Sequence, residues 1–327
     1  MEVQSNMKKG LILQERDKEL LEFLSKYKTI TLDNTKYIFE TKTYQEKRIC
    51  KLVQENYIKR LPHREISLGR RGVEYLIETG TEIKEHCRSS NNLERLKIIS
   101  DIAAFTTIDH YSSFQPSWTF KSKDTPTNDS RRYLGLLTFM DAFYNVYSFY
   151  EGKNDKYITS IAYDLKKQHS ILNSIIFTTD MDKILYHKKK LSFGDSHLYV
   201  IEYNEFNKKI FRNYEKIKTC IFSDLSKEHK VEYTDFRHMD YLIDKKLYFK
   251  LILFWDINQI RYLHYFFEEN PTLRNNYYLI CFREFEQYLQ DFASNCKAIF
   301  IDKSTIEGYL DKDYIEYNGI KLDYPTY

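Results

Sequence analysis

The sequence predicts an α/β protein with a small N-terminal region of short helices and a hairpin, followed by a larger region of alternating strands and helices. Apolar residues recur at helical spacing three times before residue 57, where short extended segments take over. From Leu134 onward, short apolar runs alternate with amphipathic segments, a pattern typical of α/β folds. The 327 residues suit about two domains of ~100–200 residues each.

The N-terminal region contains three predicted helices. The first covers residues 15–26, and the second follows Thr31-Leu32-Asp33 and carries Tyr37, Ile38 and Phe39. Thr43 can cap the third helix, residues 44–56, with Glu46 three residues later as in a capping box.

A β-hairpin follows these helices. Residues 57–61 and 65–68 are predicted strands around the turn Pro62-His63-Arg64, and Gly69 and Gly72 frame a return into a helix at residues 73–78. Three helices followed by a hairpin is the order of a winged helix-turn-helix domain. We therefore predict such a domain at residues 1–88.

A connecting helix and a linker are predicted at residues 89–132. The helix covers residues 93–107, and the Ser/Thr/Pro-rich stretch from Ser112 to Ser130 is predicted to be a loop. The α/β domain then occupies residues 133–327.

Two runs of alternating elements make up the α/β domain. The first has strands at 136–139, 147–150, 174–178 and 199–203, with helices at 158–168 and around 183–187. The second has strands at 251–255, 277–282 and 298–301, with helices at 257–269 and 285–292. The runs are compatible with an internal duplication, although unrelated βαβαβ segments would look alike.

Composition restricts the class of protein. Hydrophobic residues make up 42% and charged residues 30% of the chain, which is typical of a globular protein. Five cysteines without a CxxC pair favour neither a disulfide framework nor a zinc site. Because the N-terminus lacks an apolar leader and no segment approaches ~20 apolar residues, we expect a cytoplasmic protein without membrane association.

Positive charge is concentrated around the third predicted helix. Residues 41–75 hold nine Lys/Arg and four Glu, a net charge of +5, whereas the whole chain carries +3. On the helix, basic residues share one face while Ile49, Leu52 and Val53 lie largely opposite, the division that a recognition helix in a DNA major groove requires. The predicted contacts to double-stranded DNA are Lys42, Thr43, Tyr44, Gln45, Lys47, Arg48, Lys51, Lys59, Arg60, Arg64, Arg70 and Arg71.

The N-terminal segments also resemble a known family. The runs LQERDKELLEFLSKYKTITLDNTKYIF, KRICKLVQENYIKRL and ISLGRRGVEYL are similar to the winged-helix part of the replication-relaxation family of plasmids and mobile elements. Leu68, Gly72 and Leu76 match the end of that family's wing, and the resemblance covers about residues 11 to 155. It implies a DNA-binding protein that acts in replication initiation or its control.

A nuclease is the first alternative. Asp141 and the segment Glu151-Gly152-Lys153 are similar to the Asp…(Glu)-x-Lys pattern of restriction-endonuclease-like folds, in which two carboxylates hold Mg²⁺ and a lysine assists the attacking water. Met140 stands where that pattern usually has proline. Such a catalytic site requires Asp141, Glu151 and Lys153 to converge.

No other enzyme class is indicated by a motif. The chain has no GxxxxGK[ST] loop, no HExxH and no His-x-His, so no cofactor or metal ligands are predicted beyond Mg²⁺ in the nuclease alternative. A second alternative is a winged-helix transcription regulator. A homodimer and replication or regulatory protein partners are further expectations.

Overall fold

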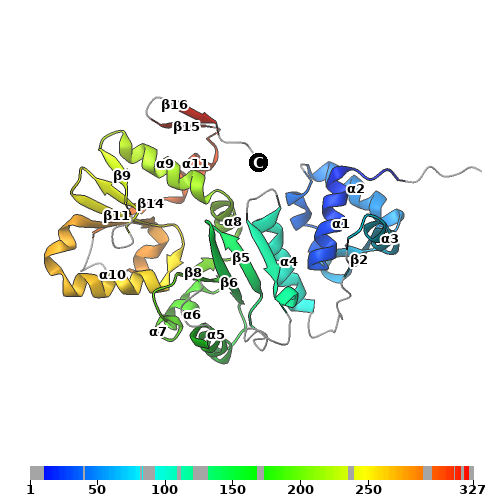
Figure 1. Ribbon diagram of the computed structural model, residues 1–327, viewed down its shortest axis with the longest axis horizontal. Helices are drawn as coiled ribbons and strands as arrows, with labels where there is room; N and C mark the ends of the chain where they lie inside the picture. Colours follow the sequence, from blue (N-terminus) through cyan, green and yellow to red (C-terminus); the bar gives the residue numbers. More distant parts are fainter. Residues whose placement is uncertain are drawn as a thin grey trace, which may run out of the picture. The chain divides into compact units, whose positions relative to one another are not determined.

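The computed structural model describes residues 11–39, 41–81, 83, 93–108, 112–120, 132–167, 173–234, 239–289, 297–312, 314–317 and 320–323. The chain divides into two compact units, Met1–Pro116 and Ser117–Tyr327 (Figure 1). Both helices and several sheets are present, as the sequence predicted for an α/β protein.

The first unit combines helices with a small sheet. Its elements are α1 (Glu15–Tyr27), β1 (Ile30–Thr31), the 3-10 helix η1 (Asn34–Tyr37), α2 (Lys42–Gln54), β2 (Ile58–Leu61), the 3-10 turn η2 (Pro62–Arg64), β3 (Glu65–Leu68), α3 (Arg70–Glu78), α4 (Leu93–Thr107) and β4 (Ser113–Pro116). The segment after Asp33, predicted as a second α-helix, is therefore a single 3-10 turn.

Caps define the ends of the first two α-helices. At α1, Asp17 accepts a hydrogen bond from the Gln14 N–H at 2.7 Å, and Lys28 ends the helix in the left-handed conformation. At α2 the cap is Thr41, whose hydroxyl accepts from the Tyr44 N–H at 3.4 Å. Thr43, the predicted cap, lies inside the helix because α2 begins at Lys42.

The three strands β1, β3 and β2 form an antiparallel sheet in that order. Ile30 pairs with Ile66, and Ile58 pairs with Leu68. The chain then turns sharply into α3, where a Cβ at Gly72 would lie 2.2 Å from the Tyr57 carbonyl oxygen. Glycine at this position therefore permits the close approach of α3 to β2.

We predicted α4 as a connecting helix, but it belongs to the first unit. Asn34 donates to Asp101 at 2.8 Å, and the Ser100 hydroxyl donates to the Thr29 carbonyl. Ser113–Pro116 is a strand within the predicted loop, and the Tyr27 hydroxyl donates to the Phe114 carbonyl at 2.7 Å. Residues 121–130 of that loop lie outside the described residues.

The second unit is built on two larger sheets. Its elements are η4 (Ser117–Phe120), β5 (Gly135–Phe139), β6 (Ala142–Phe149), α5 (Asp155–Lys167), β7 (Asn173–Thr178), α6 (Met181–Tyr186), α7 (Lys188–Leu191), β8 (Leu198–Glu202), α8 (Glu205–Arg212), α9 (Tyr214–Ser226), β9 (Val231–Tyr233), β10 (Tyr241–Ile243), β11 (Leu247–Ile252), β12 (Trp255–Asp256), α10 (Ile257–Glu269), η7 (Pro271–Asn276), β13 (Tyr277–Phe282), η8 (Arg283–Tyr288), β14 (Lys297–Ile301), α11 (Lys303–Leu310), β15 (Tyr314–Tyr317) and β16 (Ile320–Asp323).

The same order of elements occurs in both sheets. In the first, the hairpin β5–β6 is followed by α5 and the parallel strands β7 and β8. In the second, the hairpin β10–β11 is followed by α10 and the parallel strands β13 and β14. Tyr144 pairs with Asn173 and Tyr248 pairs with Tyr277, a separation of 29 residues in each case.

Helices cover both faces of the second sheet. Tyr277 packs against Phe266 and Phe267 of α10, whereas Tyr241 packs against Phe222 of α9. Figure 1 shows α10 and α9 on the two sides of this sheet. The short strand β12 follows β11 in the chain but pairs antiparallel with β8, with Trp255 opposite Val200. The second run therefore contributes one strand to the first sheet.

Candidate nucleic-acid interface

The outward side of α2 carries four of the twelve predicted contacts. Lys42, Thr43, Lys47 and Lys51 are exposed, whereas Ile49 and Leu52 are buried against the rest of the unit. Three of these residues are cationic, and none of the three has an ion-pair partner among the described residues. This side of the helix can therefore accept negatively charged groups.

Arg48 is the main correction to the predicted interface. Its side chain is only 8% exposed and forms a buried ion pair with Asp17 of α1. Its Nε donates to both Asp17 carboxylate oxygens at 2.9 Å, its Nη2 donates to the Ile12 carbonyl at 2.8 Å, and these bonds to Asp17 raise the pKa of Arg48. Arg48 faces the interior because it lies one helical turn before the buried Leu52. It therefore fixes α2 to α1 and does not lie on the outward side of the helix, where the sequence had predicted it.

Two further predicted contacts have internal roles. The Gln45 amide donates to the Leu32 carbonyl at 2.7 Å and to the Thr35 hydroxyl at 2.6 Å, which ties α2 to η1. The Tyr44 side chain is 38% exposed, and its hydroxyl donates to Gln14. Gln45 therefore positions the helix and has no free amide N–H to read a base.

A groove of about 820 Å³ lies between η1, α2 and the hairpin β2–β3. Its lining includes four cationic side chains, Lys36, Lys42, Arg60 and Arg64, and two acidic ones, Asp33 and Glu46. Lys36 and Cys50 line this groove although the sequence did not indicate them. The positive charge of Lys36, next to the predicted recognition helix, could have indicated that it lines the groove. No feature of the sequence around Cys50 indicated this position.

The hairpin β2–β3 presents further cations. Lys59 and Arg60 are exposed on β2, and the Arg60 guanidinium lies 3.7 Å from the Cys50 sulfur. His63 and Arg64 at the tip both have φ of 59°, and Arg64 forms an exposed ion pair of 3.1 Å with Asp33. An exposed pair of this kind contributes little to stability, so Arg64 can exchange Asp33 for a phosphate.

The last two predicted contacts, Arg70 and Arg71, differ in how much of their side chains is exposed. Arg70 is exposed and forms an i,i+4 pair with Glu74 at 2.9 Å. Arg71 is partly buried, pairs with Glu55 at 2.5 Å and lies 4.8 Å from the centre of the Tyr57 ring. Arg71 therefore joins α3 to the end of α2 and is a structural residue.

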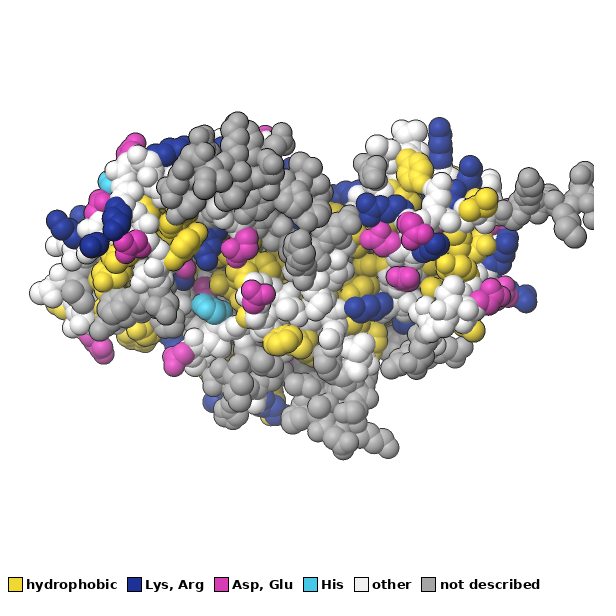
Figure 2. Space-filling view, turned by 45° about the horizontal axis from the view of Figure 1, so that its top comes forward, with side chains coloured by type: hydrophobic (Ala, Val, Ile, Leu, Met, Phe, Trp, Pro, Cys, Tyr) yellow, Lys and Arg dark blue, Asp and Glu magenta, His cyan; other side chains and the backbone are white. Residues whose placement is uncertain are grey.

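Charge on the visible surface is mixed. Figure 2 shows Lys and Arg side chains interspersed with Asp and Glu side chains on the face it presents. Positive charge is therefore a local feature of α2 and the hairpin, and the face shown in Figure 2 has no single sign of charge.

The predicted nuclease trio does not converge. Asp141 lies in the turn before β6, and Glu151 and Lys153 follow the other end of the same strand. Eight residues of extended strand span about 26 Å, so these side chains cannot share one Mg²⁺. Within the described residues, no cluster of three or more His, Cys, Asp or Glu side chains could hold a metal ion.

Two further observations concern the whole chain. No helix in the described part combines the length and the apolar character needed to span a bilayer. Comparison with family models, with curated proteins and with solved structures gave no match.

Proposed function

We propose that the first unit is a winged helix-turn-helix domain that binds double-stranded DNA, with α2 as the recognition helix and the β2–β3 hairpin as the wing. The observation that carries this proposal is the set of exposed cations on α2 and the hairpin, Lys42, Lys47, Lys51, Lys59, Arg60 and Arg64. Of these, Lys42, Arg60 and Arg64 also line the groove between the two elements. A helix held firmly at its inner face and cationic at its outer face is what major-groove binding requires.

The residues divide into two roles. Thr43 and Lys47, on the outward side of α2, approach base edges in the major groove. Lys59, Arg60 and Arg64 of the hairpin contact phosphates, which set affinity and its salt dependence. Arg48 and Gln45 hold the helix in place and contribute to binding only through its orientation.

Fluorescence anisotropy with a labelled duplex tests these roles. Arg60→Gln should weaken binding to every sequence and reduce the slope of log K against log salt by about 0.9. Lys47→Gln should raise Kd about 5- to 150-fold for the preferred site, equivalent to 1–3 kcal/mol, and relax the base preference. The matched control is Lys189→Gln, because Lys189 is exposed on α7 of the second unit. If Lys189→Gln lost as much affinity for the duplex as Arg60→Gln, the assignment of Arg60 as a phosphate contact would be wrong.

The biological setting that we propose is replication initiation, or its control, on a plasmid or similar mobile element. It is supported by the resemblance of the N-terminal segments to the replication-relaxation family. Selection of bound fragments from the source DNA tests it: repeated sites from one locus would support replication, and sites in promoters would instead indicate a transcription regulator.

We infer that the second unit arose by duplication of one hairpin–helix–strand–helix–strand module. The support is the equal separation of 29 residues across the first crossover and the identical order of parallel strands in both sheets. A restriction-endonuclease-like fold of the α/β domain stays a prediction.

A further inference from the structure

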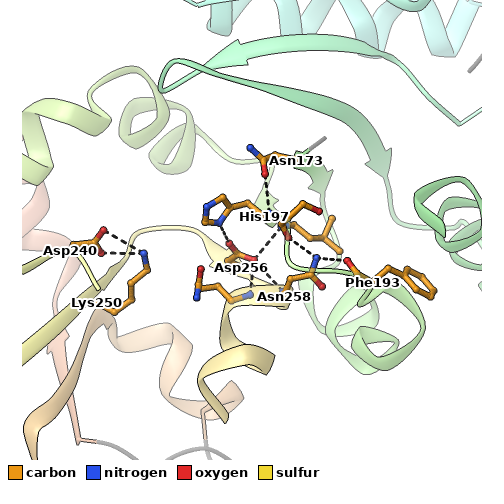
Figure 3. A network of polar contacts seen from close by, with 10 residues as sticks. Asn173, Phe193, His197, Asp240, Lys250, Asp256 and Asn258 are labelled. Atoms are coloured by element: carbon orange, nitrogen blue, oxygen red, sulfur yellow. Dashed lines mark hydrogen bonds and ion pairs between the residues drawn. The ribbon is translucent and has the colours of Figure 1, made fainter. Parts of the chain in front are cut away.

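In the second unit, His197 lies directly before β8 and is held in a fixed position. The backbone N–H of His197 donates to the Asn173 side-chain oxygen at 3.0 Å, and the ring stacks on Tyr199 with a centroid distance of 5.4 Å and an angle of 5°. The ring Nδ1 lies 2.5 Å from a carboxylate oxygen of Asp256 (Figure 3). His197 is therefore constrained through its backbone, its ring face and one ring nitrogen.

Asp256 is buried and acts only as an acceptor here. Its Oδ1 accepts from the backbone N–H groups of Leu198, Asn258 and Gln259, each at 3.1 Å, and so caps α10. Its Oδ2 is left for His197. Because the carboxylate accepts, Nδ1 carries the proton, and the lone pair of the neutral ring is on Nε2.

The segment before His197 is held by the same helix. The Asn258 amide donates to the carbonyls of Phe193 and Ser196 at 3.0 and 2.7 Å, and Arg261 donates to the carbonyl of Gly194 at 2.8 Å. These bonds join the first run of the unit to the second and fix the position of the ring in advance.

Nε2 is the open position of this arrangement. The His197 side chain is 34% exposed, and Nε2 has no hydrogen-bond partner among the described residues. Burial raises the pKa of Tyr199 and of Tyr144 above the usual range, so both phenols stay neutral near pH 7. Asp256 caps α10 through Oδ1 alone. The contact between its Oδ2 and His197 is therefore not needed for the cap.

We propose that His197 and Asp256 form a general-base dyad that takes a proton at Nε2 from water or from the hydroxyl of a bound ligand. In that step the ligand O–H bond breaks, an N–H bond forms at Nε2, and Asp256 stabilises the imidazolium. The proton then passes to a leaving group or to solvent. Asp256 is the positioning residue, since it sets the tautomer and orientation of His197.

Hydrolysis of p-nitrophenyl acetate by the full chain tests the dyad. Water loses one proton to Nε2 as its oxygen bonds to the ester carbon, and p-nitrophenolate leaves with the electron pair of the broken C–O bond. The acetic acid that forms loses its proton to solvent as acetate, and the imidazolium also returns its proton to solvent. His197→Gln should abolish the steady turnover that continues after exposed nucleophiles such as Cys50 have each been acylated once. His264→Gln is the matched control, because His264 is 35% exposed and pairs with Glu268 on the surface of α10.

Asp256→Asn separates positioning from folding. Asparagine also caps helices, so α10 stays capped, but its NH2 group cannot accept from Nδ1–H, and the ring turns to the tautomer with hydrogen on Nε2. We expect the loss of activity seen in His197→Gln, and the ¹⁵N shifts of the His197 ring should report the change of tautomer. Wild-type rates in either variant, or a wild-type protein with hydrogen on Nε2, would overturn the proposal.

Discussion

Replacement of Arg48 by methionine tests how α2 is held. The change leaves the carboxylate of Asp17 buried, at 0% exposure, without its guanidinium partner. Removing one member of a buried ion pair costs about 3–5 kcal/mol, a large part of the 5–15 kcal/mol that stabilises a typical domain. We therefore expect Arg48→Met to destabilise the first unit by this amount.

Hydrogen exchange of peptides from α1 and α2, followed by mass spectrometry, measures this loss locally. A cost of 3–5 kcal/mol corresponds to exchange that is faster by about two to three and a half orders of magnitude. The control Lys47→Met alters an exposed neighbour and should change stability by less than about 0.5 kcal/mol.

A second replacement decides the cause. Asp17→Asn in the Arg48→Met background removes the unpaired charge, keeps an acceptor for the Gln14 N–H, and should recover most of the loss. The reasoning is refuted if Arg48→Met exchanges like the wild type, or if the double variant is no more stable than Arg48→Met alone.

Three further predictions concern packing and reactivity. Gly72→Ala should destabilise the first unit by about 1–3 kcal/mol in urea unfolding, because its Cβ would meet the Tyr57 carbonyl; an unchanged midpoint would contradict this. Gly308→Ala, in α11 with nothing within 4 Å of the new Cβ, should instead stabilise by about 0.4–1 kcal/mol, and a loss would show an unseen clash. Burial raises the pKa of Cys281 to about 12, so alkylation of its thiol at pH 8 should be slow until the protein unfolds, and fast labelling in the native state would argue against this burial.

Local patterns in the sequence predicted much of the second unit. Residues 257–269 and 277–282 form a helix and a strand with the predicted bounds, because each is a continuous apolar or amphipathic run. The predicted strand 251–255 was inaccurate, since the chain changes sheets between Ile252 and Trp255. A change of sheet depends on tertiary pairing and leaves no periodic pattern.

The sequence predicted exposure correctly for cations whose placement depends on local periodicity. Lys47 and Lys51 followed from helical periodicity, and Lys59 and Arg60 from the hairpin. Arg48 did not, because its position depends on Asp17, 31 residues earlier in the chain. Likewise, no short sequence motif could have predicted the pairing of His197 with Asp256, because the two residues are 59 positions apart in the chain.

The most direct test of DNA binding at α2 and the hairpin is protection of Cys50 from alkylation. Cys50 is exposed and lines the groove beside Arg60, whereas Cys220 and Cys281 are buried and serve as internal references in the same mass-spectrometric map. We predict that saturating duplex DNA slows alkylation of Cys50 and leaves the two references unchanged. Alkylation of Cys50 at the same rate in a protein with duplex bound would contradict the account.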